Sequence, residues 1–366
     1  MSDPPASASA LRDRLWAAVA DGDELAAADV LHDGLRAGWD EEDLLVDVVA
    51  AVQRKVGTEW AAARITVAQE HAATAVNERI VTTLVHRPGT DGRLRPRRGR
   101  GRGRATVSCV DGEWHAFPAR LVAEVLRLRG HQVDYLGAQT PTPHLIAHLH
   151  RTNPDAVLLS ASLPTHLPAA HAAITACQAV GVPVLAGGGA FGRDGRFAFA
   201  LGADRWAPDA RGAAAVLDAG LPRPATTARQ VVDDLPHLAD QEYTMAVQSR
   251  GQLVKQTLAD LENRFPPLRA YRPAQRERTA EDLAHIVDFL ATALYVDDCE
   301  VFTSFVTWTA GILEAREVPP HSLTTGLDIL AGQLRDFPRS LAFLHQGIAV
   351  LGGRPLSPVP GPDTQE

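Results

Sequence analysis

Residues 105–118 read ATVSCVDGEWHAFP, and this stretch decides the fold of the middle of the chain. Its first part, 105–110, has the length and the mostly apolar content of a buried strand. A polar turn with a glycine follows, and a helical pattern begins near residue 119. A strand that runs through a short loop into a helix is the building unit of an α/β sheet, so we expect such a sheet here.

The same alternation continues to residue 220. Further strand-like runs lie at 132–136, 156–160 and 182–186, and helical patterns lie at 119–129, 143–151 and 166–180. Short apolar strands that alternate with helices predict a flavodoxin-like, doubly wound parallel sheet over residues 105–220. Such sheets bind ligands outside the carboxyl ends of their strands, so we expect a site in the loops that follow the strands.

The segments on either side have a different pattern. Residues 8–87 are rich in Ala, Leu, Asp and Glu, and their apolar residues recur at helical spacing in four stretches, which predicts a four-helix bundle. Residues 241–347 show a second set of helical patterns and predict an all-α domain. The run at 88–104 contains arginines, glycines and prolines and is predicted to be a linker. A chain of 366 residues has room for these three domains.

Composition and charge exclude several classes of protein. Hydrophobic residues make up 45% of the chain and charged residues 22%, as in an ordinary globular protein. No apolar stretch is long enough to span a bilayer, no secretory signal is visible, and the three cysteines lack zinc or disulfide spacing, so we expect a cytoplasmic protein without a membrane partner. The net charge of −8 disfavours nucleic acid, although the seven arginines between Arg93 and Arg104 can contact phosphate.

Three loops at the expected site carry polar or flexible residues. His115 follows the first strand, and Glu113, two residues earlier, can hold one nitrogen of its ring and make the other a better metal ligand. The loops after the third and fourth strands contribute hydroxyls and a glycine run, namely Ser160, Ser162, Gly187, Gly188 and Gly189. Taken singly, each loop also fits an ordinary role: a surface histidine, a helix N-cap or a tight turn.

Together the three loops resemble the cobalamin-binding domain, whose pattern is Asp-x-His-x-x-Gly, then a serine loop, then Gly-Gly. In that family the histidine is the lower ligand of cobalt, and the displaced nucleotide tail runs beside the serine and glycine loops. The resemblance implies that His115 is the metal ligand, that Glu113 is its partner, and that the serine and glycine loops contact the tail. Pro118 stands where the pattern has glycine, so the backbone path at this point differs from the pattern.

The bundle contains a second motif. Nine residues separate Trp60 from the pair Glu70 and His71, which resembles the light-sensing branch of cobalamin-binding domains. There these residues line the space above the corrin that holds the 5′-deoxyadenosyl group, so the resemblance implies adenosylcobalamin. An indole and a carboxylate suit an adenosyl group, although a core Trp and a surface Glu-His pair fit the sequence as well. Ala61 stands where well-known light-sensing transcription factors have a histidine, so after photolysis either His71 or no residue ligates cobalt from above.

The C-terminal helical block looks globin-like, through residues 289–294, the aromatic positions up to Trp308, and residues 313–319. A light-sensing cobalamin module followed by such a domain is similar to photocobilins, which bind biliverdin in that domain. The two propionates of a bilin favour arginines close to aromatic side chains. The candidate bilin-binding residues are Arg269, Tyr271, Arg272, His285 and Trp308, with Arg276, Arg278 and Tyr295 as further members of the same stretch.

The resemblance implies a light sensor and not an enzyme. Light breaks the cobalt–carbon bond, the bundle shifts against the sheet domain, and the assembly of a homo-oligomer changes, which signals to an unidentified partner. Two alternatives fit the same sequence. A bundle followed by this sheet domain also forms the corrinoid methyl carriers of methyltransferase systems, and an adaptor that binds cobalamin without a bilin is the third hypothesis.

Overall fold

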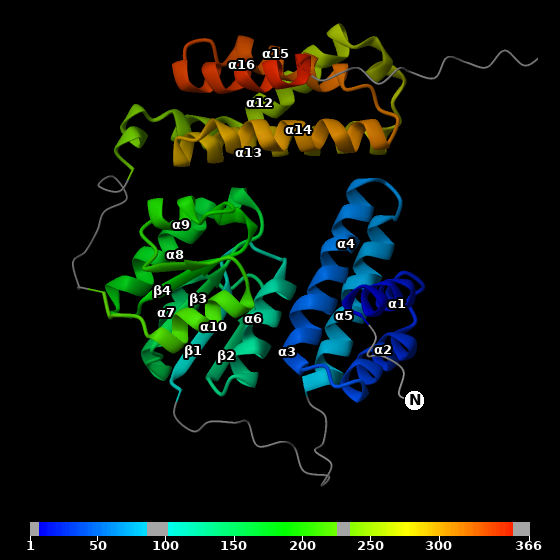
Figure 1. The fold of residues 1–366 in the computed structure, drawn as a ribbon. Helices are drawn as coiled ribbons and strands as arrows, with labels where there is room; N and C mark the ends of the chain where they lie inside the picture. The colour runs from blue at the N-terminus through cyan, green and yellow to red at the C-terminus, as the bar shows by residue number, and fades with distance from the viewer. Residues whose placement is uncertain (1–6, 86–101, 225–234, 354–366) are drawn as a thin grey trace, which may run out of the picture. The chain divides into compact units, whose positions relative to one another are not determined.

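The computed structural model describes residues 7–85, 102–224 and 235–353. They fall into two compact units, Met1–Pro236 and His237–Glu366 (Figure 1). The first unit holds an N-terminal helical cap and a five-stranded parallel sheet of flavodoxin-like type, and the second is all-helical. The predicted fold class is confirmed at this level, and the globin-like form of the second unit stays a prediction. None of the helices in these ranges combines the length and the apolar character that a membrane crossing needs.

The cap consists of helices that bury their apolar stripes against one another. They are α1 (Ala8–Ala20), α2 (Glu24–Arg36), α3 (Glu41–Asp43), the π-helical segment η1 (Leu44–Val49), α4 (Ala50–Ala61) and α5 (Val67–Val85). Because α3, η1 and α4 follow one another without a break, residues 7–85 form four helical rods. The side chains of Asp23 and Asp40 accept hydrogen bonds from the first turns of α2 and α3, at 2.9 and 2.8 Å, which fixes where these helices begin.

The sheet domain has five parallel strands between two layers of helices (Figure 1). The strands are β1 (Arg104–Cys109), β2 (Gln132–Gly137), β3 (Ala156–Ser160), β4 (Val184–Gly187) and β5 (Arg205–Ala207). The helices are α6 (Ala116–Leu128), α7 (Thr142–Thr152), α8 (Leu167–Ala179), α9 (Arg196–Ala200) and α10 (Ala210–Ala219), with short 3-10 turns η2 (Pro164–His166) and η3 (Gly189–Phe191). Helix α6 packs against α10, and α7 packs against α8.

The strand order is β2-β1-β3-β4-β5, so the direction of winding reverses at β1. The loops after β1 and β3 therefore leave the sheet side by side, at the switch point where folds of this kind bind ligands. Strand β1 begins at Arg104, which the sequence prediction assigned to the linker, and the linker up to residue 101 lies outside the described residues. The guanidinium of Arg104 binds the carboxylate of Asp134 on β2 through two hydrogen bonds, of 2.9 and 3.1 Å.

The cap and the sheet domain share one hydrophobic core. Side chains of η1 and α6, among them Leu45, Val49, Leu121 and Val125, belong to a single buried cluster. This shared core explains why the two predicted domains form one compact unit.

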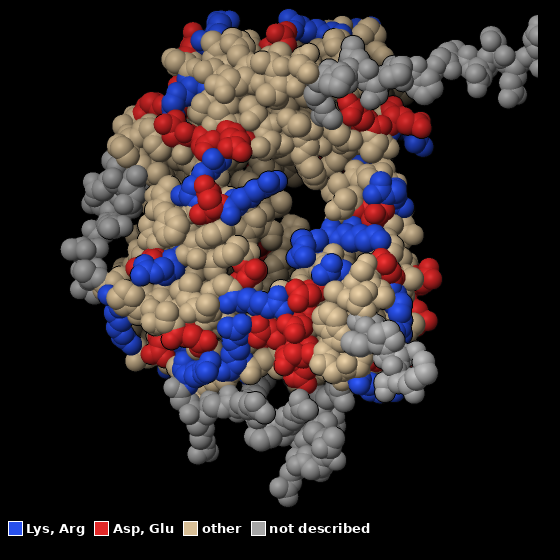
Figure 2. Space-filling view, viewed as in Figure 1, with Lys and Arg blue, Asp and Glu red and all other residues tan. Residues whose placement is uncertain are grey.

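Ion pairs close the joint at one end of the cap. Arg129, just after α6, binds both carboxylate oxygens of Glu42 in α3, at 2.9 and 2.7 Å. Arg211 of α10 reaches Asp43 at 2.6 Å and Asp47 at 2.8 Å. Figure 2 shows basic and acidic side chains intermingled where the cap meets the sheet domain. We call these five residues the joint cluster.

The second unit is built from η4 (Pro236–Asp240), α12 (Glu242–Arg264), η5 (Pro266–Ala270), α13 (Pro273–Val296), α14 (Cys299–Ala315), α15 (His321–Gln333) and α16 (Pro338–Gly352). The buried carboxylate of Glu242, at the start of α12, accepts hydrogen bonds from the backbone amides of Arg339 and Ser340, at 3.0 and 2.7 Å. These amides belong to the first turn of α16, so a buried side chain from one helix fixes the beginning of another.

Candidate functional site

A buried carboxylate joins the two loops at the switch point of the sheet. Glu113 has no exposed surface, and its Oε1 accepts hydrogen bonds from the backbone amide of His115 at 2.8 Å and from its ring nitrogen Nδ1 at 2.6 Å. The other oxygen, Oε2, accepts from the amides of Ser162 at 2.6 Å and Leu163 at 3.3 Å. The loop after β1 and the loop after β3 are therefore held by one side chain.

The hydrogen bonds of Glu113 decide its charge. Burial alone raises the pKa of Glu113, but the hydrogen bonds from the side chain and backbone of His115 and from Ser162 outweigh it and lower the pKa to about 2. The hydrogen bond to Glu113 raises the pKa of His115, burial opposes this, and the charges of Glu113 and Glu70 raise it further. Glu113 is thus a carboxylate at neutral pH.

The imidazole of His115 is oriented for coordination. With Nδ1 as the donor to Glu113, the second ring nitrogen, Nε2, keeps its lone pair for a metal. The side chain is 56% exposed, so the ring stands at the surface of the site while its partner is buried. This confirms the predicted pairing of Glu113 with His115 as geometry, and the cobalt contact itself stays a prediction.

The serine and glycine loops pack backbone against backbone. Gly188 has φ +102°, and a Cβ there would lie 2.3 Å from the carbonyl oxygen of Ala161. A Cβ on Gly189 would lie 3.2 Å from the carbonyl oxygen of Ser162. The glycines therefore let the loops after β3 and β4 touch. Ser162 contributes its backbone amide to Glu113, whereas the prediction gave its hydroxyl a contact with the ligand, which stays a prediction.

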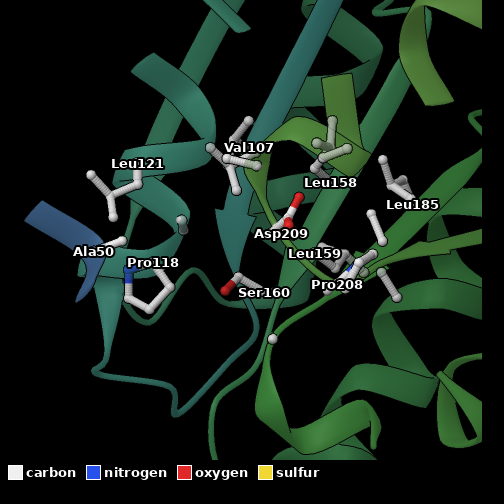
Figure 3. Close-up of a pocket in the computed structure, with 18 of the residues that line it drawn as sticks. Ala50, Val107, Pro118, Leu121, Leu158, Leu159, Ser160, Leu185, Pro208 and Asp209 are labelled. Atoms are coloured by element: carbon white, nitrogen blue, oxygen red, sulfur yellow. The ribbon is translucent and has the colours of Figure 1, made fainter. Parts of the chain in front are cut away.

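An apolar cavity of about 190 Å³ opens beside these loops (Figure 3). Ser160, Gly187 and Gly188 form one wall, and the rest is mostly apolar, including Leu121, Leu158 and Leu185. Pro118 also lines it, from the first turn of α6, where a missing amide hydrogen costs no helical hydrogen bond. The proline that replaces the glycine of the pattern is therefore a residue of the cavity wall. Val46 and Ala50 of the cap also line the cavity.

The cap residues of the second motif lie at one end of the cap. Helices α4 and α5 run in opposite directions and are joined by residues 62–66, so Trp60 and the pair Glu70 and His71 come to the same end. The ring nitrogen Nδ1 of His71 lies 2.7 Å from Oε2 of Glu70 and 2.9 Å from the carbonyl oxygen of Val67. The charge of Glu70 is the smallest of the named contributions that raise the pKa of His115.

The sequence prediction missed large exposed apolar residues in the two site loops and in the cap. Trp114 is 74% exposed, Leu163 is 40% exposed, and Val67 in the cap is 55% exposed. Their position in the chain was the available signal, because Trp114 lies between the two paired residues and Leu163 follows the predicted serine loop. Exposed large apolar side chains that surround a polar group are typical of a site that a ligand covers.

The residues of the site fit a cobalamin. An imidazole backed by a buried carboxylate suits an axial cobalt ligand, the apolar cavity beside Ser160 suits the aromatic base of the tail, and the exposed apolar residues suit the broad corrin. The imidazole, its carboxylate partner and the cavity lining have this arrangement in the structure.

The structure divides the five candidate bilin residues into two groups. Arg269, Tyr271 and Arg272 lie at or before the start of α13, and the guanidinium of Arg269 binds the carbonyl oxygen of Glu262 at 3.1 Å. His285 lies more than three helical turns further along α13 and is exposed, and Trp308 of α14 is 49% exposed. The structure therefore does not bring all five together.

An open groove of about 700 Å³ between α12 and α15 contains none of these five residues. Its charged side chains are Arg264 and Arg335 together with three aspartates, and Arg264 pairs with Asp328 at 2.5 Å. This charge pattern does not favour a ligand with two carboxylates.

Two family models match the chain. One, described as a B12 binding domain, matches residues 103–217, and a second, also described as a B12 binding domain, matches residues 11–84. No curated protein matches the chain.

Several solved structures are similar to it. The monomethylamine corrinoid protein of Methanosarcina barkeri is 20% identical with a TM-score of 0.47, over 57% of this chain and 97% of that one. The methanol:cobalamin methyltransferase complex of Methanosarcina barkeri is 21% identical with a TM-score of 0.30, over 57% and 78%. A cobalamin-binding protein of Desulfitobacterium hafniense is 20% identical with a TM-score of 0.30, over 56% and 95%.

The two family matches coincide with the cap and with the sheet domain, and the loops of the sheet domain carry the Glu113–His115 pair. The protein is therefore a cobalamin-binding protein, with an N-terminal helical cap and a Rossmann-like B12-binding domain.

Proposed function

We propose that this protein is a light sensor that holds adenosylcobalamin between the cap and the sheet domain and biliverdin in its second unit. The observation that carries the proposal is the pair of Glu70 and His71, whose Oε2 and Nδ1 lie 2.7 Å apart, at the same end of the cap as Trp60. In this proposal these polar groups of the cap lie on the side of cobalt opposite His115, where an upper cobalt substituent would bind.

Different residues of this chain bind different parts of the cofactor. His115 offers Nε2 to cobalt, and Glu113 keeps the ring in one orientation. Ser160 and the glycine loop border the cavity for the nucleotide tail. Bound adenosylcobalamin supplies a cobalt–carbon bond that light can break.

Two cap residues suit an adenosyl group, and a third can take its place on cobalt. The carboxylate of Glu70 is 28% exposed and accepts hydrogen bonds, which matches ribose hydroxyls. The indole of Trp60, at the end of α4, offers an apolar face for the nucleoside. Since Ala61 cannot ligate a metal, His71 is the candidate upper ligand once the adenosyl group has left.

The joint cluster determines which part of the cap can move. Arg129 and Arg211 fasten α3 and η1 to the sheet domain, at the opposite end of the α3–α4 rod from Trp60. Loss of contacts with the upper group therefore frees the far end of the cap first. We propose that this movement changes the assembly of a homo-oligomer and that the chain signals without catalysing a reaction.

The test compares dark and lit protein. The chain is loaded with adenosylcobalamin in darkness, and its absorption spectrum and molar mass by light scattering are recorded before and after green light. A spectral change that accompanies a change in mass supports the sensor. A protein that is indifferent to light, yet passes a methyl group from methylcobalamin to a thiol with a partner methyltransferase, is a methyl carrier, and the proposal is then wrong.

Biliverdin is tested on the same preparation. The support for it is the pair of exposed groups His285 and Trp308, which lie on neighbouring helices joined by the stacked rings of Phe289 and Phe305, with centroids 3.8 Å apart. A red-shifted biliverdin band that Trp308→Ala abolishes supports a bilin site at this face. A band equal to that of free biliverdin leaves an adaptor that binds cobalamin alone.

A further inference from the structure

A ladder of hydrogen bonds runs through the cap and ends on Glu70. The hydroxyl of Thr74 donates to Oε1 of Glu70 at 3.1 Å, and the amide nitrogen of Gln53 donates to that hydroxyl at 2.8 Å. The amide nitrogen of Asn77 in turn donates to Oε1 of Gln53 at 2.7 Å. Three of the four residues lie one turn apart on α5, and Gln53 joins them from α4.

The far end of the ladder is an unusual core residue. Asn77 has no exposed surface, and its neighbours on α5 in the core, Val76 and Ile80, are apolar. No donor among the described residues reaches its Oδ1. A buried acceptor without a partner costs stability, so a leucine would suit this position better if packing alone mattered. This cost suggests that Asn77 is kept for its amide nitrogen, which donates the first hydrogen bond of the ladder, to Gln53.

We propose that Asn77, Gln53 and Thr74 are positioning residues that hold the Glu70 carboxylate in the orientation that selects an adenosyl group. This rests on the proposed function, because it takes Glu70 as the acceptor for the ribose hydroxyls. The ladder fixes Oε1, and Nδ1 of His71, which is hydrogen-bonded to the carbonyl oxygen of Val67, lies 2.7 Å from Oε2. The carboxylate is therefore held through one oxygen before a ligand arrives, and the Glu70 side chain stays 28% exposed.

The direction of the hydrogen bonds supports this role. Each hydrogen in the ladder points toward Glu70, from Asn77 to Gln53, to Thr74 and to the carboxylate. Hydrogen bonds in such a chain polarise one another, and the last one, to a charged acceptor, gains most. A carboxylate that is already ordered loses less conformational entropy on binding than a freely rotating one.

The experiment measures the preference of the full chain for adenosylcobalamin over methylcobalamin, as the ratio of dissociation constants in darkness. Methylcobalamin has the same corrin and tail but no ribose, so the ratio isolates the upper group. We expect Thr74→Val and Asn77→Leu each to reduce this ratio about threefold to tenfold, with methylcobalamin affinity unchanged. Asn77→Leu should also leave the melting temperature of the ligand-free protein equal or higher, which a merely structural Asn77 would not do.

Two further variants make the outcome decisive. Thr83→Val is the matched control, because its hydroxyl is exposed on the same helix and donates to the carbonyl oxygen of Arg79, at 3.1 Å. Glu70→Gln should reduce the ratio at least as much as the ladder variants. If Glu70→Gln reduces it and the ladder variants do not, the positioning role is overturned and the adenosyl site stands. If Glu70→Gln leaves the ratio unchanged, the adenosyl contact of the proposed function and the ladder fall together.

Discussion

At the scale of single residues, Glu113 is the side chain on which the site depends. It is buried, charged and bonded to amides of two loops, so its removal acts on the orientation of His115 and on the spacing of the loops at once. We expect Glu113→Gln to weaken cobalamin binding by about 10–100-fold, as is usual when the carboxylate behind a metal-ligating histidine is lost. Titration followed by the visible spectrum measures this.

Asp111→Asn is the control for Glu113. Asp111 is an exposed acid in the same loop, and its replacement removes the same charge without touching the hydrogen bonds of His115. Equal weakening in both variants would show that the local negative charge matters and the hydrogen bonds do not.

Gly188 allows a second prediction for a single residue. Alanine there combines a left-handed φ of +102° with a Cβ 2.3 Å from a carbonyl oxygen, so Gly188→Ala should lower the free energy of unfolding by about 2–4 kcal/mol. Gly181, with φ +77° and open space around it, serves as the matched site, where alanine should cost about 1–2 kcal/mol. Denaturant unfolding compares the two, and equal losses would refute the role of the close approach.

The sequence predicts the site only where its residues are neighbours in the chain. The spacing of Glu113 and His115 indicated their pairing, because only Trp114 lies between them in the loop after β1. The amides of Ser162 and Leu163 were not predicted as partners of Glu113, since they lie about 50 residues away and carry no side-chain signal. Backbone donors from distant loops become visible only in the fold.

At the scale of elements, the joint cluster couples the cap to the sheet domain through charge. The hydrogen bond from Arg129 lowers the pKa of Glu42 from its ordinary value of 4.5, although burial opposes this. A depressed pKa in the folded state means that the pair stabilises the fold fully above about pH 4.5 and ceases to do so as the pH falls through the lower, folded pKa.

We therefore expect the first unit to lose stability on acidification from pH 6 to 3, and Arg129→Gln to reduce this pH dependence. At pH 7 the variant should cost about 1.5–3 kcal/mol, the range for a hydrogen bond to a charged group. Arg14→Gln is the control, because Arg14 and Asp33 form a pair within the cap that is 48% and 34% exposed. An unfolding midpoint equally sensitive to pH in both variants would contradict the role of the joint.

The elements that sequence patterns missed are short or begin at unusual residues. Strand β5 has three residues and lies at the edge of the sheet, which is too short to show a periodicity. Helix α6 begins at Ala116, three residues before the prediction, because Pro118 reads as a break although the first turn of a helix tolerates proline. The longer strands and helices were predicted because several residues carried each pattern.

At the scale of the whole molecule, the chain has two compact units where three domains were predicted. The composition of the cap and of the sheet domain differs, but the core they share joins residues far apart in the sequence. Sequence composition shows where the pattern changes, and it does not show which apolar faces bury one another.

Two units predict two thermal transitions, of which only one responds to cobalamin. Ligand at 100 times its dissociation constant stabilises the unit that binds it by about 2.7 kcal/mol and leaves the other unchanged. Differential scanning calorimetry with and without cobalamin should show one transition that moves and one that stays. His115→Ala should remove most of the shift, and a single transition that moves as a whole would mean that the units unfold together.

The hydrogen bonds of Glu113 also have a consequence for the kinetics of uptake. Because one carboxylate holds both loops at the switch point, we expect that these loops need no ordering step before a corrinoid enters. If His115 is the lower cobalt ligand as proposed, we expect the slow event to be the release of the corrinoid's own base from cobalt. The rate of cobalamin binding should then depend on how fast the base dissociates from cobalt in solution and not on a conformational change of the protein.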